Sequence, residues 1–126
     1  MVNIDTSKVL ELFQNLSECP SEKLTSLTPL VENSTFSVEG IIDENKYTDE
    51  YKSRCEYAAA AYAFYNYACR EGAREKIICT LEGKMTSSEN NQKAENKIRW
   101  AKELKIQSLV SISSILKDND FLFKAI

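Results

Sequence analysis

The sequence predicts a mainly α-helical fold, a small bundle of about four helices in a single domain covering residues 1–126. Only three glycines and two prolines occur in the 126 residues, so turn signals are few. Four consecutive alanines, Ala58 to Ala61, mark a strong helix because alanine is the best helix former. Apolar residues recur at helical spacing through most of the chain. The exception lies before the last helix, where a β-hairpin is expected.

The first helix is expected to begin after Asp5, a side chain suited to an N-cap, and to end near Ser17. Its apolar positions follow the spacing i, i+3, i+4 and i+7 at Val9, Leu12, Phe13 and Leu16. Pro20 predicts a break, because the residue before a proline is driven away from helical geometry.

A short restart is predicted after the break, with Ser21 as its cap. Thr28 and Pro29 then predict a second helix start, because proline is favoured at the first helical position. One apolar face follows, from Leu30 to Ile42, and the polar run at residues 43–46 closes it.

The segment Tyr51 to Gly72 predicts the long central helix. Thr48 is its expected cap, and Gly72 is its expected end, since glycine is common just past a helix. Aromatic and small apolar residues form two adjacent rows at helical spacing. Such a wide apolar surface is expected of a helix that neighbours cover on several sides.

Residues 75–88 predict a β-hairpin. In the run K-I-I-C-T-L from Lys76 to Leu81, β-branched residues are enriched, and Ile77, Cys79 and Leu81 alternate with Ile78 and Thr80. Glu82 and Gly83 can form a two-residue turn, and residues 84–87 can return. The other interpretation of this segment is a surface loop, extended or helical.

A long last helix is predicted from Ser87 or Ser88 to Leu116. Its apolar positions at helical spacing are Ala94, Ile98, Ala101, Leu104, Ser108, Ile112 and Ile115. Trp100, Leu109 and Val110 are expected to widen this face. An apolar tail, residues 119–126, ends the sequence.

The composition argues against several function classes. The absence of histidine excludes a Ser–His or Cys–His catalytic pair and every zinc site that needs imidazole. Cys19, Cys55, Cys69 and Cys79 form no C-x-x-C pair, so no metal cluster is expected and four reduced thiols are predicted. We expect no catalytic residues, no cofactor and no enzyme activity.

A net charge of -3 argues against binding nucleic acid through its phosphates, so no sequence-specific nucleic-acid partner is expected. No apolar run has the roughly 18–20 residues needed to cross a bilayer, so no membrane partner is expected either. The first residues do not have the pattern of a secretion signal.

The aromatic residues of the central segment leave three interpretations open. Aromatic side chains at helical spacing are usually core residues. Tyrosines are also favoured in subunit contacts. They can finally form one wall of a ligand pocket, here beside Tyr62 and Tyr65.

Two segments predict assembly rather than catalysis. An exposed apolar tail usually marks an interaction site. A two-stranded hairpin alone is marginally stable in water and gains from a partner. The predicted partner-binding residues are Ile77, Cys79, Leu81, Met85, Phe121, Phe123 and Ile126.

From about Pro29 to Ile126, the order of segments resembles the small head–tail connector, or neck, proteins of tailed bacteriophages and prophages. The similar segments are SVEGII, the alanine–tyrosine helix AAAAYAFYNYACREGARE, the extended segment CTLEGKMTSSE, RWAKELK in the last helix, and the F-x-F-x-A-I ending.

The resemblance implies a non-enzymatic structural protein. Such proteins form a ring of many copies beneath the portal, extend the DNA channel and present a docking surface to tail-side proteins. The implied partners are therefore other copies of the chain and the portal or tail-side proteins. The implied location is the virion, and the bacterial host cytoplasm during assembly. The alternative hypothesis is a small helical ligand-binding or regulatory module that uses the tyrosine-rich helix.

Overall fold

A computed structural model describes the backbone of residues 2–81 and 88–117, with side chains described for residues 2–74 and 92–117. The chain is mainly helical, as predicted. Within the described residues the elements are α1 (Thr6–Ser17), α2 (Ser21–Ile41), the short 3-10 helix η1 (Asp49–Tyr51), α3 (Lys52–Leu81), α4 (Ser88–Ser111) and the 3-10 helix η2 (Ser113–Ile115).

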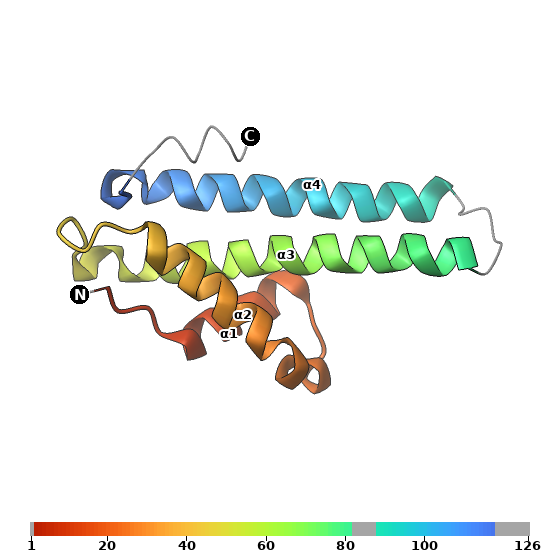
Figure 1. Ribbon diagram of the computed structural model, residues 1–126, viewed down its shortest axis with the longest axis horizontal. Coiled ribbons are helices and arrows are strands. Elements are labelled where there is room, and N and C mark those ends of the chain that lie inside the picture. The colour runs from red at the N-terminus through yellow and green to blue at the C-terminus, as the bar shows by residue number, and fades with distance from the viewer. Residues whose placement is uncertain (1, 82–87, 118–126) are drawn as a thin grey trace.

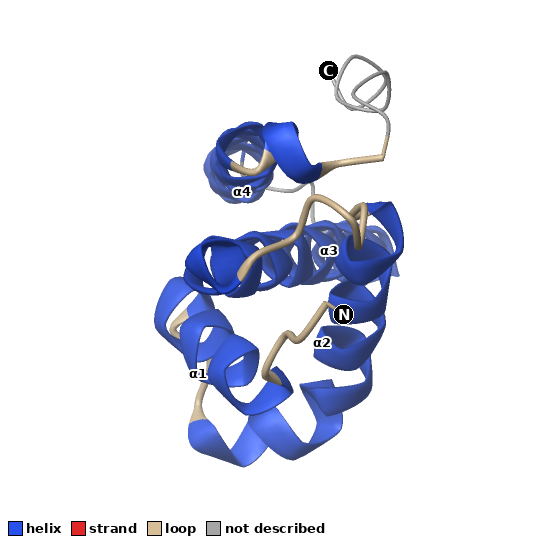
Figure 2. Cartoon of the chain, turned by 90° about the vertical axis from the view of Figure 1, so that its left-hand side faces the viewer, coloured by secondary structure: helices blue, strands red, loops and turns tan. Residues whose placement is uncertain are grey.

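Helix α3 is the centre of the fold. Figure 1 shows α4 lying along one side of α3 and running in the opposite direction, with α1 and α2 on the other side. In the end-on view the same three layers are visible (Figure 2). Among the described helices, α1, α2 and α4 all contact α3, whereas α4 contacts neither α1 nor α2. Each outer layer therefore depends on α3 for its position.

The alanine run explains why α3 can hold this position. Ala58, Ala59, Ala60 and Ala61 are all completely buried. Four consecutive helical residues point in directions about 100° apart, so their burial means that neighbours cover α3 on every side. This confirms the prediction of a central helix touched from several sides. The small side chains let the neighbouring helices approach closely.

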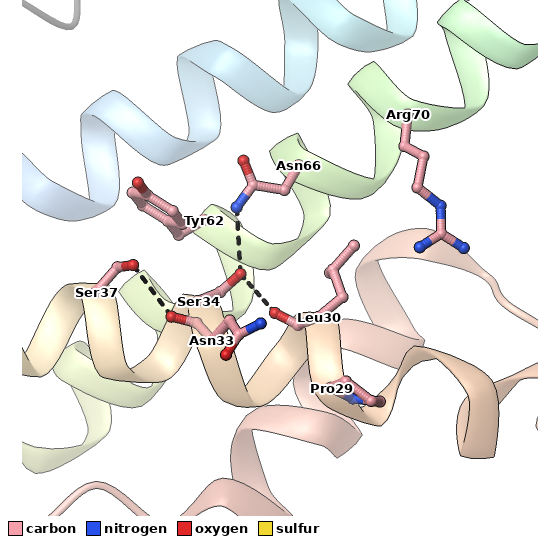
Figure 3. Close-up of a pocket in the computed structure, with 8 residues that line it drawn as sticks. All are labelled: Pro29, Leu30, Asn33, Ser34, Ser37, Tyr62, Asn66 and Arg70. Atoms are coloured by element: carbon pink, nitrogen blue, oxygen red, sulfur yellow. Dashed lines mark hydrogen bonds between the residues drawn. The ribbon is translucent and has the colours of Figure 1, made fainter.

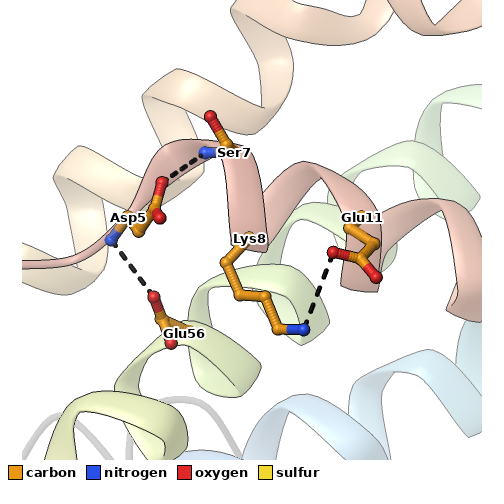
Figure 4. Close-up of polar contacts among 5 residues, drawn as sticks. All are labelled: Asp5, Ser7, Lys8, Glu11 and Glu56. Carbon is orange, nitrogen blue, oxygen red and sulfur yellow. Dashed lines mark hydrogen bonds and ion pairs between the residues drawn. The ribbon is translucent and has the colours of Figure 1, made fainter.

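Helix α1 follows the sequence prediction. The Asp5 carboxylate accepts a hydrogen bond from the Ser7 backbone N–H at 3.0 Å and caps the helix (Figure 4). The Asp5 backbone N–H donates in turn to the buried Glu56 carboxylate on α3, at 3.3 Å. Val9 and Phe13 are completely buried. Phe13 meets the Tyr67 ring edge-to-face, with 5.7 Å between ring centroids.

Helix α2 corrects the predicted second start at Thr28 and Pro29. The helix continues through Pro29, although proline removes one backbone hydrogen bond. Thr28 is an internal residue whose hydroxyl donates to the Leu24 carbonyl at 2.9 Å. Leu27 and Val31, on either side of the proline, are almost fully buried. Tertiary packing therefore outweighs the local preference to break the helix.

Helix α3 corrects two further predictions. It does not end at Gly72 but continues to Leu81, so residues 76–81 are helical rather than the first strand of a hairpin. The turn and return strand predicted for residues 82–87 lie outside the described residues. A Cβ atom built on Gly72 would lie 2.8 Å from Ile98 Cδ1 on α4. Gly72 thus permits close packing of α3 against α4 instead of ending the helix.

After α4, the chain lies beside the end of α2. Helix α4 ends at Ser111, earlier than the predicted Leu116, and η2 follows. Ile42 and Leu116 form an isolated antiparallel bridge. The Asp43 backbone N–H donates to the Ile115 carbonyl at 2.8 Å, and the Lys117 N–H donates to the Ile41 carbonyl at 2.9 Å. These bonds tie α4 to the α2 side of the fold. The predicted apolar tail, residues 119–126, lies outside the described residues.

Candidate functional site

An open groove of about 450 Å³ lies between α2 and α3 (Figure 3). Most of the side chains that line it are polar. Its lining consists of Pro29, Leu30, Asn33, Ser34, Ser37, Tyr62, Asn66 and Arg70. The groove is the candidate binding site of the described part of the chain.

A chain of hydrogen bonds fixes the floor of the groove. The Asn66 side-chain N–H donates to the Ser34 hydroxyl at 3.2 Å, and that hydroxyl donates to the Leu30 carbonyl at 2.8 Å (Figure 3). The Ser37 hydroxyl donates to the Asn33 carbonyl at 3.0 Å. These bonds join α2 to α3 through Asn66 and hold its amide in one orientation. Within the described residues, the Asn33 amide has no hydrogen-bond partner and can meet a ligand.

Lys105 of α4 contacts the ring of Tyr62, one of the residues that line the groove. Its ammonium group lies 4.9 Å from the centroid of the Tyr62 ring and 4.5 Å from that of Tyr65. Both contacts are in the range of a cation–π interaction. Partial burial lowers the pKa of Lys105, as does the charge of nearby Lys102. A hydrogen bond with Cys69 raises the pKa of Tyr65, and burial raises it further. Two tyrosine rings, one of which lines the groove, therefore hold the Lys105 ammonium group in place.

The tyrosines divide between core and surface. Tyr67 is buried, whereas Tyr51, Tyr62 and Tyr65 are half-buried and Tyr57 is exposed. Tyr62 lines the groove and Tyr65 contacts the same lysine. The surface beside Tyr62 is an open groove rather than a closed cavity.

The described cysteines Cys19, Cys55 and Cys69 are all free thiols. Cys55 is completely buried in the core. Its burial raises the pKa of the thiol from 9.0 to about 11, and the nearby Glu56 carboxylate contributes to the increase. A buried thiol with a raised pKa is a poor nucleophile, because the thiolate is the reactive form.

Cys55 predicts a loss of stability at alkaline pH. The folded state keeps the thiol proton up to a pKa of about 11, whereas the unfolded chain releases it near 9.0. The free energy of unfolding should therefore fall as the pH rises from about 9 to about 11. Urea unfolding measured at several pH values in this range should show a smaller decrease in the free energy of unfolding for Cys55→Ala than for the unchanged chain. Equal slopes for the two proteins would contradict the assignment to Cys55.

The predicted partner-binding residues lie away from the groove or beyond the described part. Ile77, Cys79 and Leu81 belong to the last two turns of α3, and their side chains are outside the described residues. Met85, Phe121, Phe123 and Ile126 lie outside the described residues altogether. Their role in assembly stays a prediction.

Sequence reasoning missed the polar residues of the groove: Asn33, Asn66 and Arg70. One signal was available, because Asn66 is a polar residue in an otherwise apolar part of the central helix. A second was Ser34, a small hydroxyl residue on the apolar face of α2. Pairing the two required knowing that α2 crosses α3 at this level.

Among the described side chains, no three metal-ligating residues come together. No helix within the described ranges has the length and apolar character required to span a membrane. The chain matches no protein-family model, no curated protein and no solved structure.

Proposed function

We propose that this chain is a non-enzymatic structural subunit of a ring-shaped oligomer, of the head–tail connector type that joins portal and tail in bacteriophages. The observation that carries the proposal is the exposure of large apolar side chains on opposite sides of α3. Phe36 on α2 is 65% exposed, and Trp100 and Val110 on α4 are 50% and 52% exposed. A subunit in a closed ring needs two different contact surfaces, one for each neighbour.

The placement of the similar segments supports the same proposal. The alanine–tyrosine segment forms most of α3, and the segment RWAKELK lies on α4. A rigid core helix with helices packed on two sides suits a subunit whose role is to hold surfaces in place. Its proposed partners are other copies of the chain and the portal or tail-side proteins. Its proposed location is the virion, and the bacterial host cytoplasm during assembly.

The exposed apolar residues provide the test. Phe36→Ser and Val110→Ser should each change the free energy of unfolding by no more than about 0.5 kcal/mol, because both side chains are exposed. Each should reduce assembly, measured by mass photometry and negative-stain microscopy with and without a portal protein. Ala73→Ser, at an exposed residue of α3, is the matched control and should assemble normally.

A truncated chain that lacks residues 119–126 tests the predicted role of the tail. It should keep its helical circular-dichroism spectrum and lose assembly. Rings formed by the truncated chain would contradict the role of the tail. Rings formed equally well by the Phe36 and Val110 variants would remove the main support for the ring proposal.

The groove favours a second candidate function, a small ligand-binding or regulatory module that uses the tyrosine-rich helix. Its support is the meeting of Tyr62, Asn66 and Arg70 in one hollow. Nuclear magnetic resonance titrations with pooled anionic and aromatic metabolites should then shift the Asn33 and Asn66 side-chain amide signals. Unchanged amide signals throughout the pool would count against this function.

A further inference from the structure

The loop between α2 and α3 carries a concentration of negative charge. Residues 43–50, here called the acidic loop, contain four carboxylates and one lysine. The four are Asp43, Glu44, Asp49 and Glu50, and all but Asp43 are exposed. The one ion pair among the described side chains joins Lys8 to Glu11 at 3.6 Å, so no carboxylate of this loop forms an ion pair with a described cation.

Positive charge gathers elsewhere, around the groove. Arg70 lines the groove and is exposed. Lys105 sits on the Tyr62 and Tyr65 rings at the neighbouring edge, and Lys102 is close enough to influence it. These five residues are here called the cationic face. None of its three cations forms an ion pair with a described carboxylate.

The acidic loop of one chain lies far from Arg70 of the same chain. The loop joins α3 at its first residue, Lys52, whereas Arg70 lies roughly five turns, or about 27 Å, along the helix. The backbone bonds at Ile41 and Asp43 hold the start of the loop against the end of α4 (Figure 1). The loop carboxylates and the Arg70 guanidinium therefore lie at separate places on one subunit.

We infer that the acidic loop of one copy docks onto the cationic face of a neighbouring copy, with a loop carboxylate entering the groove between α2 and α3. The inference rests on the proposed ring, for which it names the contact between subunits. A contact between two different surfaces is head-to-tail, and such contacts generate a ring when the rotation closes.

The groove has the groups that recognise a carboxylate. The Arg70 guanidinium can bind two carboxylate oxygens at once. The Asn33 amide adds a neutral N–H donor on the α2 side of the groove. The tyrosine rings hold the Lys105 ammonium group in place before a partner binds. Binding therefore does not have the entropic cost of ordering this side chain.

Paired charge reversal tests the contact. The face variant carries Arg70→Glu and Lys102→Glu. The loop variant carries Glu44→Lys and Glu50→Lys, two exposed residues, and leaves Asp43 in place because its carboxylate accepts the Asn45 backbone N–H. A control variant with Lys8→Glu and Lys23→Glu makes the same change in net charge as the face variant, on α1 and α2 away from the groove.

Sedimentation velocity should show that the face variant and the loop variant each associate at least about tenfold more weakly than the unchanged chain, because like charges then face each other. An equimolar mixture of the two should recover association, since each supplies the charge that the other lacks. The control variant should associate like the unchanged chain. Raising the salt from about 0.05 M to about 0.5 M should weaken association of the unchanged chain.

The outcomes separate this contact from the ring proposal. An unchanged chain that forms oligomers indifferent to salt and to both reversals would overturn the contact and leave the ring proposal standing. Association that is lost in each variant and not recovered on mixing would also overturn the contact. An unchanged chain that stays monomeric at low salt, both alone and with a portal protein, would contradict the ring and the contact together.

Discussion

Replacing Phe64 by alanine is expected to lower the free energy of unfolding by about 3–5 kcal/mol. Phe64 is completely buried on α3. Its ring meets the Trp100 ring of α4 edge-to-face, with 5.3 Å between centroids and 76° between planes. Truncation would leave a cavity and remove this contact. Among the described α-helices, α4 contacts only α3. No other helix can therefore compensate for the lost packing between α3 and α4.

Urea unfolding, followed by circular dichroism and by fluorescence, measures this loss of stability. Circular dichroism reports the whole helical fold. Fluorescence reports the α3–α4 contact, because Trp100 is the single tryptophan of the chain. The matched control is Phe36→Ala, which removes the same atoms from a ring that is 65% exposed. That control should change the free energy of unfolding by no more than about 0.5 kcal/mol. Equal effects at the two phenylalanines would contradict the described core.

A double-mutant cycle separates the ring pair from simple burial. The chain carrying both Phe64→Ala and Trp100→Ala should lose less stability than the sum of the two single changes. The difference should be about 0.5–1.5 kcal/mol, the usual coupling of an edge-to-face aromatic pair. Additive effects would mean that Trp100 contributes nothing specific to the docking of α4.

The sequence predicted the fold best where the helical spacing of apolar residues and a capping residue indicated the same helix. The Asp5 cap and the buried positions Val9 and Phe13 of α1 follow directly from local rules. Two adjacent rows of aromatic and small apolar residues predicted a helix covered on several sides, because they make an apolar surface wider than one stripe. These features depend on residues near one another in the chain, which is why sequence alone reveals them.

The incorrect predictions share a cause. Gly72 looked like a helix end, and residues 76–81 looked like a strand, because both judgements used local preference alone. The close approach of Ile98 to Gly72 gives the glycine a packing role that only the paired helices reveal. A short apolar run fits a strand or a buried helix equally well. Tertiary contacts decided the case of Gly72, as they did at Pro29.

The groove lay beyond sequence reasoning for a related reason. Asn66 and Ser34 are 32 positions apart, and their hydrogen bond exists because α2 packs on α3. Nothing in the sequence distinguishes Arg70 from other arginines. The packing of α2 on α3 makes it a lining residue of the groove. The individual residues carried a weak signal, but their convergence required the fold.

Replacing Ala60 by leucine tests whether close packing around α3 sets the arrangement of the other helices. Ala60 has no exposed surface, and its three neighbours in the alanine run are equally buried. A leucine there adds three carbon atoms that must push a neighbouring helix away. The free energy of unfolding should fall by about 1–3 kcal/mol, even though leucine is itself a good helix former.

The control for this change lies on the same helix. Ala73 is exposed, so Ala73→Leu makes the identical chemical change without a neighbour to displace. Its effect should stay within about 0.5 kcal/mol, as is usual for surface positions. A leucine tolerated equally at both sites would mean that α3 has free space around the alanine run. In that case contact with the alanine run would not fix the positions of the neighbouring helices, and the groove between α2 and α3 would have no rigid wall on the α3 side.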